Sequence, residues 1–380
     1  MAAPTRIGIG IIGTGWMARA HTRALQVLRT AAELPFDVEL SHLAGRDPAR
    51  TDRAAEQWGV TRASTDWRAL VDDPAVDVVV NLTGNDTHAA PSIAALQLDK
   101  HVLCEKPLAI SAVDLERMLA AAQASTAIAA CGYNYRFVPA LRVAKELLES
   151  GGLGELRQFS IGYEQDWASL DADRTGWRFD DHVAGSCVYD LSHILDLLRW
   201  FTGDPTAVVA NIATRGKAGE GARPAALGVD PEDSYEALAT LGTGTTAVLR
   251  ASRIATGRKG RQFVELTGSL GTVTWDMEDM NRLKVFLEGD RASGVAGFRD
   301  VLVTETEHPF MRHWYAPGHT IGWDDTVLHQ WISLIGTITG FDPNLPSDVA
   351  TFEDGARAVQ FADAIRESSA TRSWVTPTWS

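Results

Sequence analysis

Near the start of the chain, residues 13–18 have the types and the spacing of a phosphate-binding loop. The segment reads Gly13-Thr14-Gly15-Trp16-Met17-Ala18 and fits the pattern Gly-x-Gly-x-x-Gly/Ala. In this pattern the first glycine allows a tight turn and the second lets the backbone approach a pyrophosphate. The start of the following helix stabilises the phosphate charge. We therefore expect a dinucleotide to be contacted by Gly13, Thr14, Gly15, Trp16 and Met17.

The end of the second predicted strand bears on which dinucleotide binds there. It reads Ala44-Gly45-Arg46-Asp47, so a glycine stands where an acid usually accepts the ribose 2′-hydroxyl. The guanidinium of Arg46 suits a 2′-phosphate, and an ordinary solvated side chain is the alternative. Asp47 is more simply the N-cap of the next helix. The sequence thus favours NADP slightly over NAD and leaves both open.

Further polar motifs follow the later strands of the same region. Asn85-Asp86-Thr87-His88 comes after one strand, and Cys104-Glu105-Lys106-Pro107 ends another. A Glu-Lys-Pro segment in this position resembles the Gfo/Idh/MocA oxidoreductase family, which includes inositol and glucose dehydrogenases and glucose–fructose oxidoreductase. The resemblance extends over essentially the whole chain, because segments 132–139, 176–179, 190–200 and 352–356 look like family motifs in the same order.

This resemblance implies roles for individual residues. Lys106 matches the lysine that touches both the substrate hydroxyl and the nicotinamide. Asp190 and His193 match the acid and the histidine that orient the substrate and shuttle its proton. Further cofactor contacts are implied for Thr83, Asn85, His88 and Glu105. Further substrate contacts are implied for Arg136, Trp177 and Arg178.

The chain departs from the family pattern around these residues. Asp190 precedes His193 by three residues, whereas the family often has four, the position of Tyr189. Both spacings put the pair on one face of a helix, so a joint role is retained. The usual Thr-Pro-Asn becomes Thr83-Gly84-Asn85, and Gly185-Ser186-Cys187 precedes the acid, a change that would reshape the pocket.

The residue types fit the oxidation of a secondary alcohol. The cofactor accepts the hydride, while the protein holds the carbinol carbon and handles the hydroxyl proton. A histidine titrates near neutrality, and a neighbouring carboxylate fixes its tautomer. A lysine serves as a base where burial and a positive nicotinamide disfavour its charged form. We expect His193, oriented by Asp190, to be the main base and Lys106 to bond the same oxygen, and the reverse assignment stays open.

The elements that carry these residues alternate in the first third of the chain. Strand and helix signals follow one another over residues 1–132, which predicts an α/β domain with a doubly wound, parallel Rossmann sheet. Over residues 133–380 strand-like runs are separated by short turns such as Gly242-Thr243-Gly244. We expect there an α+β domain on a mostly antiparallel, open sheet for substrate binding and oligomerisation, with an exposed loop over residues 215–233.

Composition excludes several classes of protein. The net charge of −14 weighs against nucleic acid and anionic membranes as partners, and no apolar run reaches the length of a bilayer span. The start of the chain lacks the apolar region of a secretion signal. The cysteines (Cys104, Cys131 and Cys187) lack a disulfide or zinc spacing, so a cytoplasmic setting is expected. The histidines in segment 308–319 are not at a compact ligand spacing, so we expect no metal there and read it as a substrate-side loop.

We expect an NAD(P)-dependent oxidoreductase that transfers a hydride between the nicotinamide and a secondary alcohol of a sugar, cyclitol or polyol. The resemblance leaves alternatives on the same fold: an NAD-dependent glycosidase, a dihydrodiol dehydrogenase, or a non-catalytic sensor of dinucleotide or sugar. It also implies a homodimer or homotetramer. Trp167, Trp177, Trp314 and Trp323 are candidates for stacking on a sugar ring, whereas Trp200 and Trp331 look like core residues.

Overall fold

The computed structural model describes residues 6–32, 34–170, 177–214, 232–341 and 348–379. Contacts between Cα atoms divide the chain into two compact units. The first unit comprises residues 1–137 and 322–356, and the second comprises residues 138–321 and 357–380. Segment 322–356 was expected in the second domain, because nothing in its composition reveals the long-range contacts that place it in the first unit.

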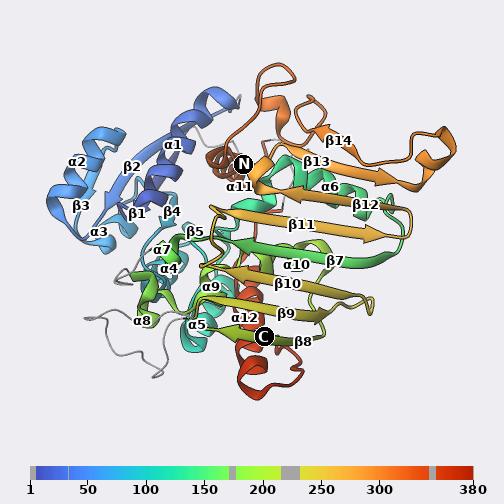
Figure 1. Cartoon of the computed structure of the whole chain (residues 1–380). Coiled ribbons are helices and arrows are strands. Elements are labelled where there is room, and N and C mark those ends of the chain that lie inside the picture. Colours follow the sequence, from blue (N-terminus) through green and yellow to red (C-terminus); the bar gives the residue numbers. More distant parts are fainter. Residues whose placement is uncertain (1–5, 33, 171–176, 215–231, 342–347, 380) are drawn as a thin grey trace. The chain divides into compact units, whose positions relative to one another are not determined.

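A six-stranded parallel sheet forms the centre of the first unit, in the order β3-β2-β1-β4-β5-β6 (Figure 1). Its strands are β1 (Arg6–Ile12), β2 (Asp37–Ala44), β3 (Arg62–Ser64), β4 (Val78–Asn81), β5 (His101–Cys104) and β6 (Ala129–Cys131). Strand β4 is buried along its whole length, as expected for an apolar strand covered on both faces. The order reverses between β1 and β4, which is the point where doubly wound sheets bind ligands. The predicted Rossmann fold is confirmed.

Helices follow the strands of this unit: α1 (Trp16–Ala31), α2 (Pro48–Trp58), α3 (Trp67–Val71), α4 (Ala89–Gln97), α5 (Ala112–Ala124) and α11 (Trp323–Thr339). The start and the end of α2 were readable from sequence: Asp47 accepts from the Arg50 N–H at 2.8 Å, and Gly59 ends the helix with φ 69°. Ser111 caps α5, because its hydroxyl accepts from the Asp114 N–H. The short elements β3 and α3 were not predicted.

The second unit contains an eight-stranded sheet in the order β14-β13-β12-β11-β7-β10-β9-β8. Its strands are β7 (Leu156–Glu164), β8 (Ala207–Ala213), β9 (Ser234–Thr240), β10 (Thr246–Ser252), β11 (Arg261–Gly268), β12 (Gly271–Asp276), β13 (Arg282–Leu287) and β14 (Arg299–Leu302). All neighbouring pairs are antiparallel except β7 with β10. The predicted mostly antiparallel sheet is confirmed, although β14 was missed.

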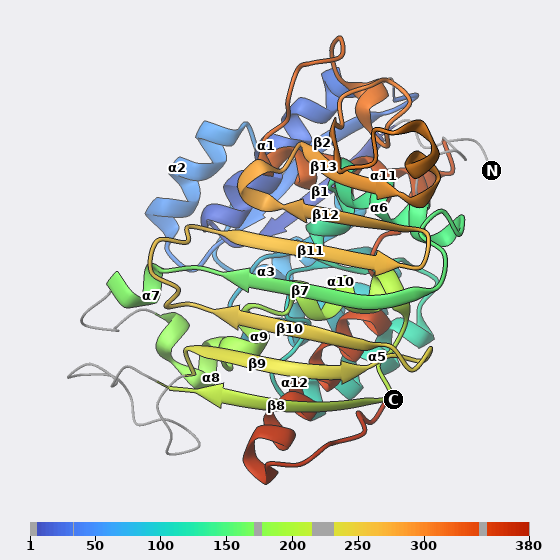
Figure 2. The same cartoon turned by 45° about the vertical axis from the view of Figure 1, so that its right-hand side comes forward.

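One face of this sheet is covered by helices of the same unit, and Figure 2 shows the other face toward the viewer. Helix α6 (Pro139–Glu149) packs on β12 and β13, and α10 (His193–Thr202) packs on β7. Burial alternates along β9 and β10, so every second side chain points away from the core. The remaining helices that lie at least partly in this unit are α7 (Trp167–Leu170), α8 (Asp181–Ala184), α9 (Cys187–Asp190) and α12 (Phe352–Thr371). The loop expected over residues 215–233 lies almost entirely outside the described residues.

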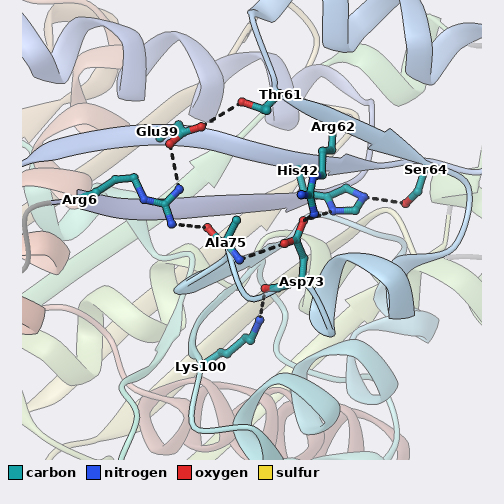
Figure 3. A network of polar contacts seen from close by, with 9 residues as sticks. All are labelled: Arg6, Glu39, His42, Thr61, Arg62, Ser64, Asp73, Ala75 and Lys100. Atoms are coloured by element: carbon teal, nitrogen blue, oxygen red, sulfur yellow. Dashed lines mark hydrogen bonds and ion pairs between the residues drawn. The ribbon is translucent and has the colours of Figure 1, made fainter.

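A polar network ties the strands of the first unit to the segment before β4 (Figure 3). The buried carboxylate of Asp73 contacts His42 Nδ1 and Arg62 Nη1, each at 2.9 Å, and accepts from the Ala75 N–H at 2.9 Å. Burial raises the pKa of the Asp73 carboxyl, but the Ala75 N–H, His42 and Arg62 together hold that pKa below its ordinary value. The ionised carboxylate therefore joins β2, β3 and the segment before β4.

Replacing this carboxylate tests its contribution to folding. Because a carboxyl with a lowered native pKa stabilises the fold above its unfolded pKa of about 3.9 and loses this effect as the pH falls, Asp73→Asn should cost about 2 kcal/mol at neutral pH and progressively less below pH ~4. Urea unfolding from pH 7 to pH 3 measures the difference. The adjacent, exposed Asp72→Asn is the control and should change stability by less than about 0.5 kcal/mol. An Asp73→Asn deficit that is constant over the whole pH range would contradict the network's role.

Candidate active site

The glycine loop follows β1 and is held at its first residue by the fold itself. The N–H of Gly13 donates to the Ala44 carbonyl at 2.8 Å, and its φ is +123°. A Cβ at this position would lie 2.7 Å from the Leu82 carbonyl oxygen. Gly13 is therefore required by the local backbone, whether or not a ligand binds.

Gly15 is different, because nothing in the described structure requires a glycine there. It precedes α1 with φ −77° and ψ −172°, which any residue adopts, and a Cβ would meet no atom within 4 Å. The open space lies beside the N-terminus of α1, where backbone N–H groups attract anions. A ligand that approaches the backbone closely explains this glycine, and the pyrophosphate of a dinucleotide fits the position.

The residues of the glycine loop contact neighbouring helices. The Thr14 carbonyl accepts from Arg50 Nη2 at 2.7 Å, which ties the loop to α2. Trp16 begins α1 and is 54% exposed, and its ring centroid lies 5.3 Å from that of Trp323. Met17 is half-buried in the first turn of α1. All the predicted loop contacts therefore lie at the carboxyl end of β1.

Arg46 is exposed in the connection between β2 and α2. Its neighbour Asp47 uses its carboxylate as the helix cap, as the sequence suggested. A Cβ at Gly45 would lie 2.4 Å from the Thr51 hydroxyl and 2.8 Å from Thr14 Cγ2, so an acid at this position would collide with the loop. The missing ribose-binding acid is thus explained by packing.

The carboxyl end of β4 carries the next predicted cofactor residues. The Thr83 hydroxyl donates to Asn81 Oδ1 at 2.8 Å, and the Asn81 amide donates to the His88 carbonyl and to Ser92 Oγ. Asn85 opens a short 3₁₀ turn, Asn85–Thr87, and is half-buried. Thr83 and Asn85 therefore flank the strand end that neighbours the glycine loop.

Lys106 follows β5 and is fixed through the residues on either side of it. Glu105 Oε2 accepts from the Lys106 N–H at 3.1 Å. His88 Nδ1 lies 2.9 Å from the Pro107 carbonyl, and the Lys106–Pro107 peptide bond is cis. Because the parallel register aligns Ile12, Asn81 and Cys104, Lys106 lies at the same sheet edge as the glycine loop, two strand spacings or about 10 Å along it.

His88 is buried and contacts the segment that follows Lys106. The residue is 1% exposed, and burial lowers the pKa of its imidazole, so the ring is neutral and donates Nδ1–H to the Pro107 carbonyl. The structure gives His88 the task of holding the loop after Lys106. The sequence motif showed that His88 is near the site but not which way its ring points.

Arg136 is likewise an anchor in this structure. It is 4% exposed, and its guanidinium lies 3.4 Å from both carboxylate oxygens of Asp354. Since Asp354 also accepts from the Thr351 N–H at 3.0 Å, the pair fastens the chain after β6 to the start of α12. The structure gives Arg136 an anchoring contact, and its contact with substrate stays a prediction.

Asp190 and His193 lie in the second unit, at a break between two helices. Asp190 is the last residue of α9, and His193 is the first residue of α10. The expectation of one continuous helical face is therefore wrong, because Leu191 and Ser192 turn the chain between them. His193 is 7% exposed, with its ring centroid 6.2 Å from that of Tyr163 on β7.

The buried guanidinium of Arg253 lies close to Asp190. Arg253 is fully buried just after β10, and its Nη1 lies 4.0 Å from Asp190 Oδ2. It donates to the Arg178 carbonyl at 2.9 Å and lies 5.5 Å from the ring centroids of Trp167 and Phe179. No sequence motif pointed to Arg253. Its positive charge attracts the Asp190 carboxylate, and its hydrogen bond fixes the segment that contains Arg178.

Tyr189, which occupies the family's more common acid position, is engaged elsewhere. Its hydroxyl donates to the Asp363 carboxylate, and the Arg366 guanidinium lies 5.6 Å from its ring centroid. Burial, together with the negative charge of Asp363, raises the pKa of the Tyr189 hydroxyl, so it stays a neutral donor. Asp190 is therefore the acid that can act with His193. It precedes His193 by three residues, and its carboxylate lies 4.0 Å from Arg253.

The predicted aromatic residue Trp177 offers a surface to a ligand. It is 48% exposed in the 3₁₀ turn Trp177–Phe179, and the Arg178 guanidinium lies 4.4 Å from its ring centroid. Trp331 is fully buried and Trp200 is 9% exposed, as expected of core residues. Trp323 is the first residue of α11.

The described part of the chain gives no sign of a metal centre or a bilayer span. Within it, no cluster of three or more His, Cys, Asp or Glu side chains is arranged to hold a metal ion. The helices that it contains are all too short or too polar to cross a membrane. Cys104, Cys131 and Cys187 are buried free thiols, and burial raises the pKa of Cys104 and Cys187 far above their ordinary value.

Comparison with known proteins agrees with this geometry. A family model described as an oxidoreductase family with an NAD-binding Rossmann fold matches residues 7–133, and a GFO/IDH/MocA C-terminal domain matches residues 141–274. Levoglucosan dehydrogenase of Pseudarthrobacter phenanthrenivorans is 30% identical over 97% of both chains. Inositol 2-dehydrogenase of Acidothermus cellulolyticus is 30% identical over 72% of this chain and 74% of its own length.

Solved structures show the same likeness. A levoglucosan dehydrogenase in complex with NADH and L-sorbose has a TM-score of 0.91 at 30% identity, covering 99% of this chain and 100% of its own. An oxidoreductase domain protein from Kribbella flavida has a TM-score of 0.90 at 35% identity with the same coverage. Because these matches extend over both units, the chain belongs to the GFO/IDH/MocA family of oxidoreductases.

Proposed function

We propose that the chain transfers a hydride between NAD(H) and a secondary alcohol of a sugar, cyclitol or polyol. The observation that carries this proposal is the open space at Gly15, which lies at the same sheet edge as Lys106. A dinucleotide whose pyrophosphate lies at α1 extends along that edge past the end of β4. Thr83, Asn85, Glu105 and Lys106 are proposed to line its path.

The chemistry divides between the cofactor and the side chains. When bound, the nicotinamide supplies the hydride acceptor or donor. His193 takes the hydroxyl proton, and Asp190, with Arg253 4.0 Å from its carboxylate, orients the histidine and the substrate. Lys106, fixed through Glu105 and Pro107, hydrogen-bonds the reacting oxygen. The proposal assigns to Lys106 and His193 a joint action on one hydroxyl group.

The relatives support the proposed substrate and cofactor. They include levoglucosan, inositol and 1,5-anhydrofructose enzymes, all of which act on polyhydroxylated rings. Trp177, with its half-exposed ring, and Arg178 are proposed to contact such a ring. The solved levoglucosan dehydrogenase binds NADH, so the preference for NADP suggested by Arg46 has no support among these relatives, and we propose NAD(H). The buried, free cysteines are consistent with a cytoplasmic setting.

We also infer that the uncovered face of the eight-stranded sheet binds a second copy of the chain. Leu238 and Val248 are 41% and 46% exposed and lie directly opposite each other on β9 and β10. Phe263 on β11 lies over Gly162, flanked by Arg250 and Arg261 at 4.9 and 4.5 Å from its ring centroid. A mixed apolar and charged sheet face of this kind supports a homodimer or a homotetramer.

The cofactor site is tested by a glycine pair. Gly15→Ala should leave the melting temperature of the cofactor-free protein unchanged, since the new Cβ meets no described atom, but should weaken NADH binding at least about tenfold by occupying the phosphate's space. Calorimetric titration measures the affinity. Gly242→Ala, which also meets no atom within 4 Å, is the control and should bind NADH normally. Equal NADH affinity in both variants would show that the dinucleotide does not bind at the glycine loop.

The catalytic assignment is tested by following NADH absorbance with a panel of sugars and inositols, using both cofactors. Lys106→Met and His193→Gln should each lower kcat by about 100-fold or more. Lys100→Met, at the other end of β5, should not change kcat. During alcohol oxidation, kcat/KM of the wild-type protein should fall at low pH as the base is protonated. The base is the residue whose substitution abolishes this pH dependence. Full activity in both variants would overturn the assignment, cleavage of glycosides would favour a glycosidase, and no turnover on the whole panel would favour a sensor.

The sheet face is tested by a charge placed in its apolar part. Val248→Glu should convert the assembled protein to monomers in sedimentation velocity, because a carboxylate buried between two copies has no partner. Val113→Glu, on the exposed side of α5, should leave the assembly intact. A wild-type protein that is monomeric at every concentration would rule out this interface.

A further inference from the structure

A buried histidine on α1 contacts the segment that carries Lys106. His21 is 1% exposed, and the indole Nε1–H of Trp331 on α11 donates to its Nδ1 at 3.0 Å. The two rings meet edge to face, at 86° with centroids 5.9 Å apart. An indole nitrogen only donates, so Nδ1 of His21 carries no proton. The imidazole is therefore neutral and carries its proton on Nε2.

That Nε2 lies beside the carboxylate of Glu105. The distance from Nε2 to Glu105 Oε1 is 3.5 Å, longer than a good hydrogen bond, and this buried nitrogen has no hydrogen-bond partner among the described residues. A buried N–H without a full hydrogen bond costs about 1–3 kcal/mol. A polar donor therefore lies beside Glu105, although an apolar side chain at position 21 would avoid the cost of burying an N–H without a full hydrogen bond.

The carboxylate of Glu105 has little freedom to move. Its Oε2 accepts from the Lys106 N–H at 3.1 Å. Its Oε1 lies 3.0 Å from the point where a Cβ at Gly132 would stand, so the glycine leaves just enough room for the carboxylate. The Lys106 N–H donates to Oε2, and His21 Nε2 lies 3.5 Å from Oε1, so each carboxylate oxygen has a nitrogen beside it. A displaced Glu105 would carry the Lys106 backbone with it.

We propose that His21 is a positioning residue for hydride transfer, a role that rests on the proposed function of Lys106. Trp331 fixes the tautomer of His21, the resulting Nε2–H orients Glu105, and Glu105 holds the backbone of Lys106. His21 touches neither substrate nor cofactor in this arrangement. Its loss acts on the rate of the chemical step, because a displacement of about 1 Å in a reacting group costs up to about 100-fold.

Two substitutions separate the contacts of His21. His21→Asn keeps an acceptor near the Nδ1 position but has no donor that reaches Glu105, whereas His21→Gln extends an amide N–H to about the position of Nε2. We expect His21→Asn to lower kcat about tenfold with an unchanged KM for the alcohol, and His21→Gln to restore kcat to within about threefold. A deuterated alcohol should show a full isotope effect in His21→Asn, since hydride transfer is the slowed step.

A buried histidine elsewhere in the same unit provides the control. His42 lies between Asp73 and Ser64 (Figure 3), at 2.9 and 3.1 Å. His42→Gln should lower the melting temperature without lowering kcat. If His21→Asn and His42→Gln reduce kcat equally, or if His21→Asn folds and keeps full kcat, the positioning role is wrong.

The tautomer is tested in the wild-type chain, so the proposal does not depend on how the variants fold. Nitrogen-15 spectra of histidine-labelled protein, with the His21 signal assigned by its absence in His21→Gln, should show a protonated Nε2 and a bare Nδ1. A protonated Nδ1 would overturn the inference. The Lys106→Met variant separates a failure of the proposed function from a failure of the His21 proposal. Full activity of Lys106→Met would contradict the proposed function. Loss of activity in Lys106→Met, together with normal kcat in His21→Asn, would contradict only the role of His21.

Discussion

The alignment of three parallel strands at their carboxyl ends governs the first unit. Ile12 pairs with Asn81 and Asn81 with Cys104, so the residues that follow these strands emerge at one edge. That edge receives the glycine loop, Thr83 and the Glu-Lys-Pro segment, which are far apart in sequence. A slip of one residue in β5 would turn its side chains to the opposite face of the sheet. Every cofactor role assigned to this unit presupposes the register.

Much of this arrangement was readable from sequence because local physics determines it. Asp47 and Gly59 mark the ends of α2 through capping and a left-handed turn, and the β-branched run in β4 indicates a strand covered on both faces. The turn at residues 242–244 specified the β9–β10 hairpin. Short elements such as β3 and α3 escaped prediction, since three to five residues carry too little periodicity.

The candidate site was only partly readable, because a motif locates a residue in the chain but not the direction of its side chain. His88 and Arg136 were predicted to touch ligands, yet one holds the Pro107 carbonyl and the other pairs with Asp354. Arg253, Trp331 and His21 drew no functional prediction, since their partners lie at least 21 residues away and no local sequence pattern indicates them. The break between Asp190 and His193 likewise follows from tertiary packing that overrides helical spacing.

The first unit is discontinuous in the chain, and this shapes how the protein is made. Its last strand, β6, receives a hydrogen bond from the far segment, since the Cys131 N–H donates to the Ala350 carbonyl at 2.7 Å. The indole that His21 contacts also comes from residues 322–356. A ribosome has therefore synthesised most of the second unit before the first can close its core. Until then the first unit has its six strands but lacks α11 and the hydrogen bond from Cys131 to Ala350, so the packing around the Rossmann sheet is completed late in synthesis.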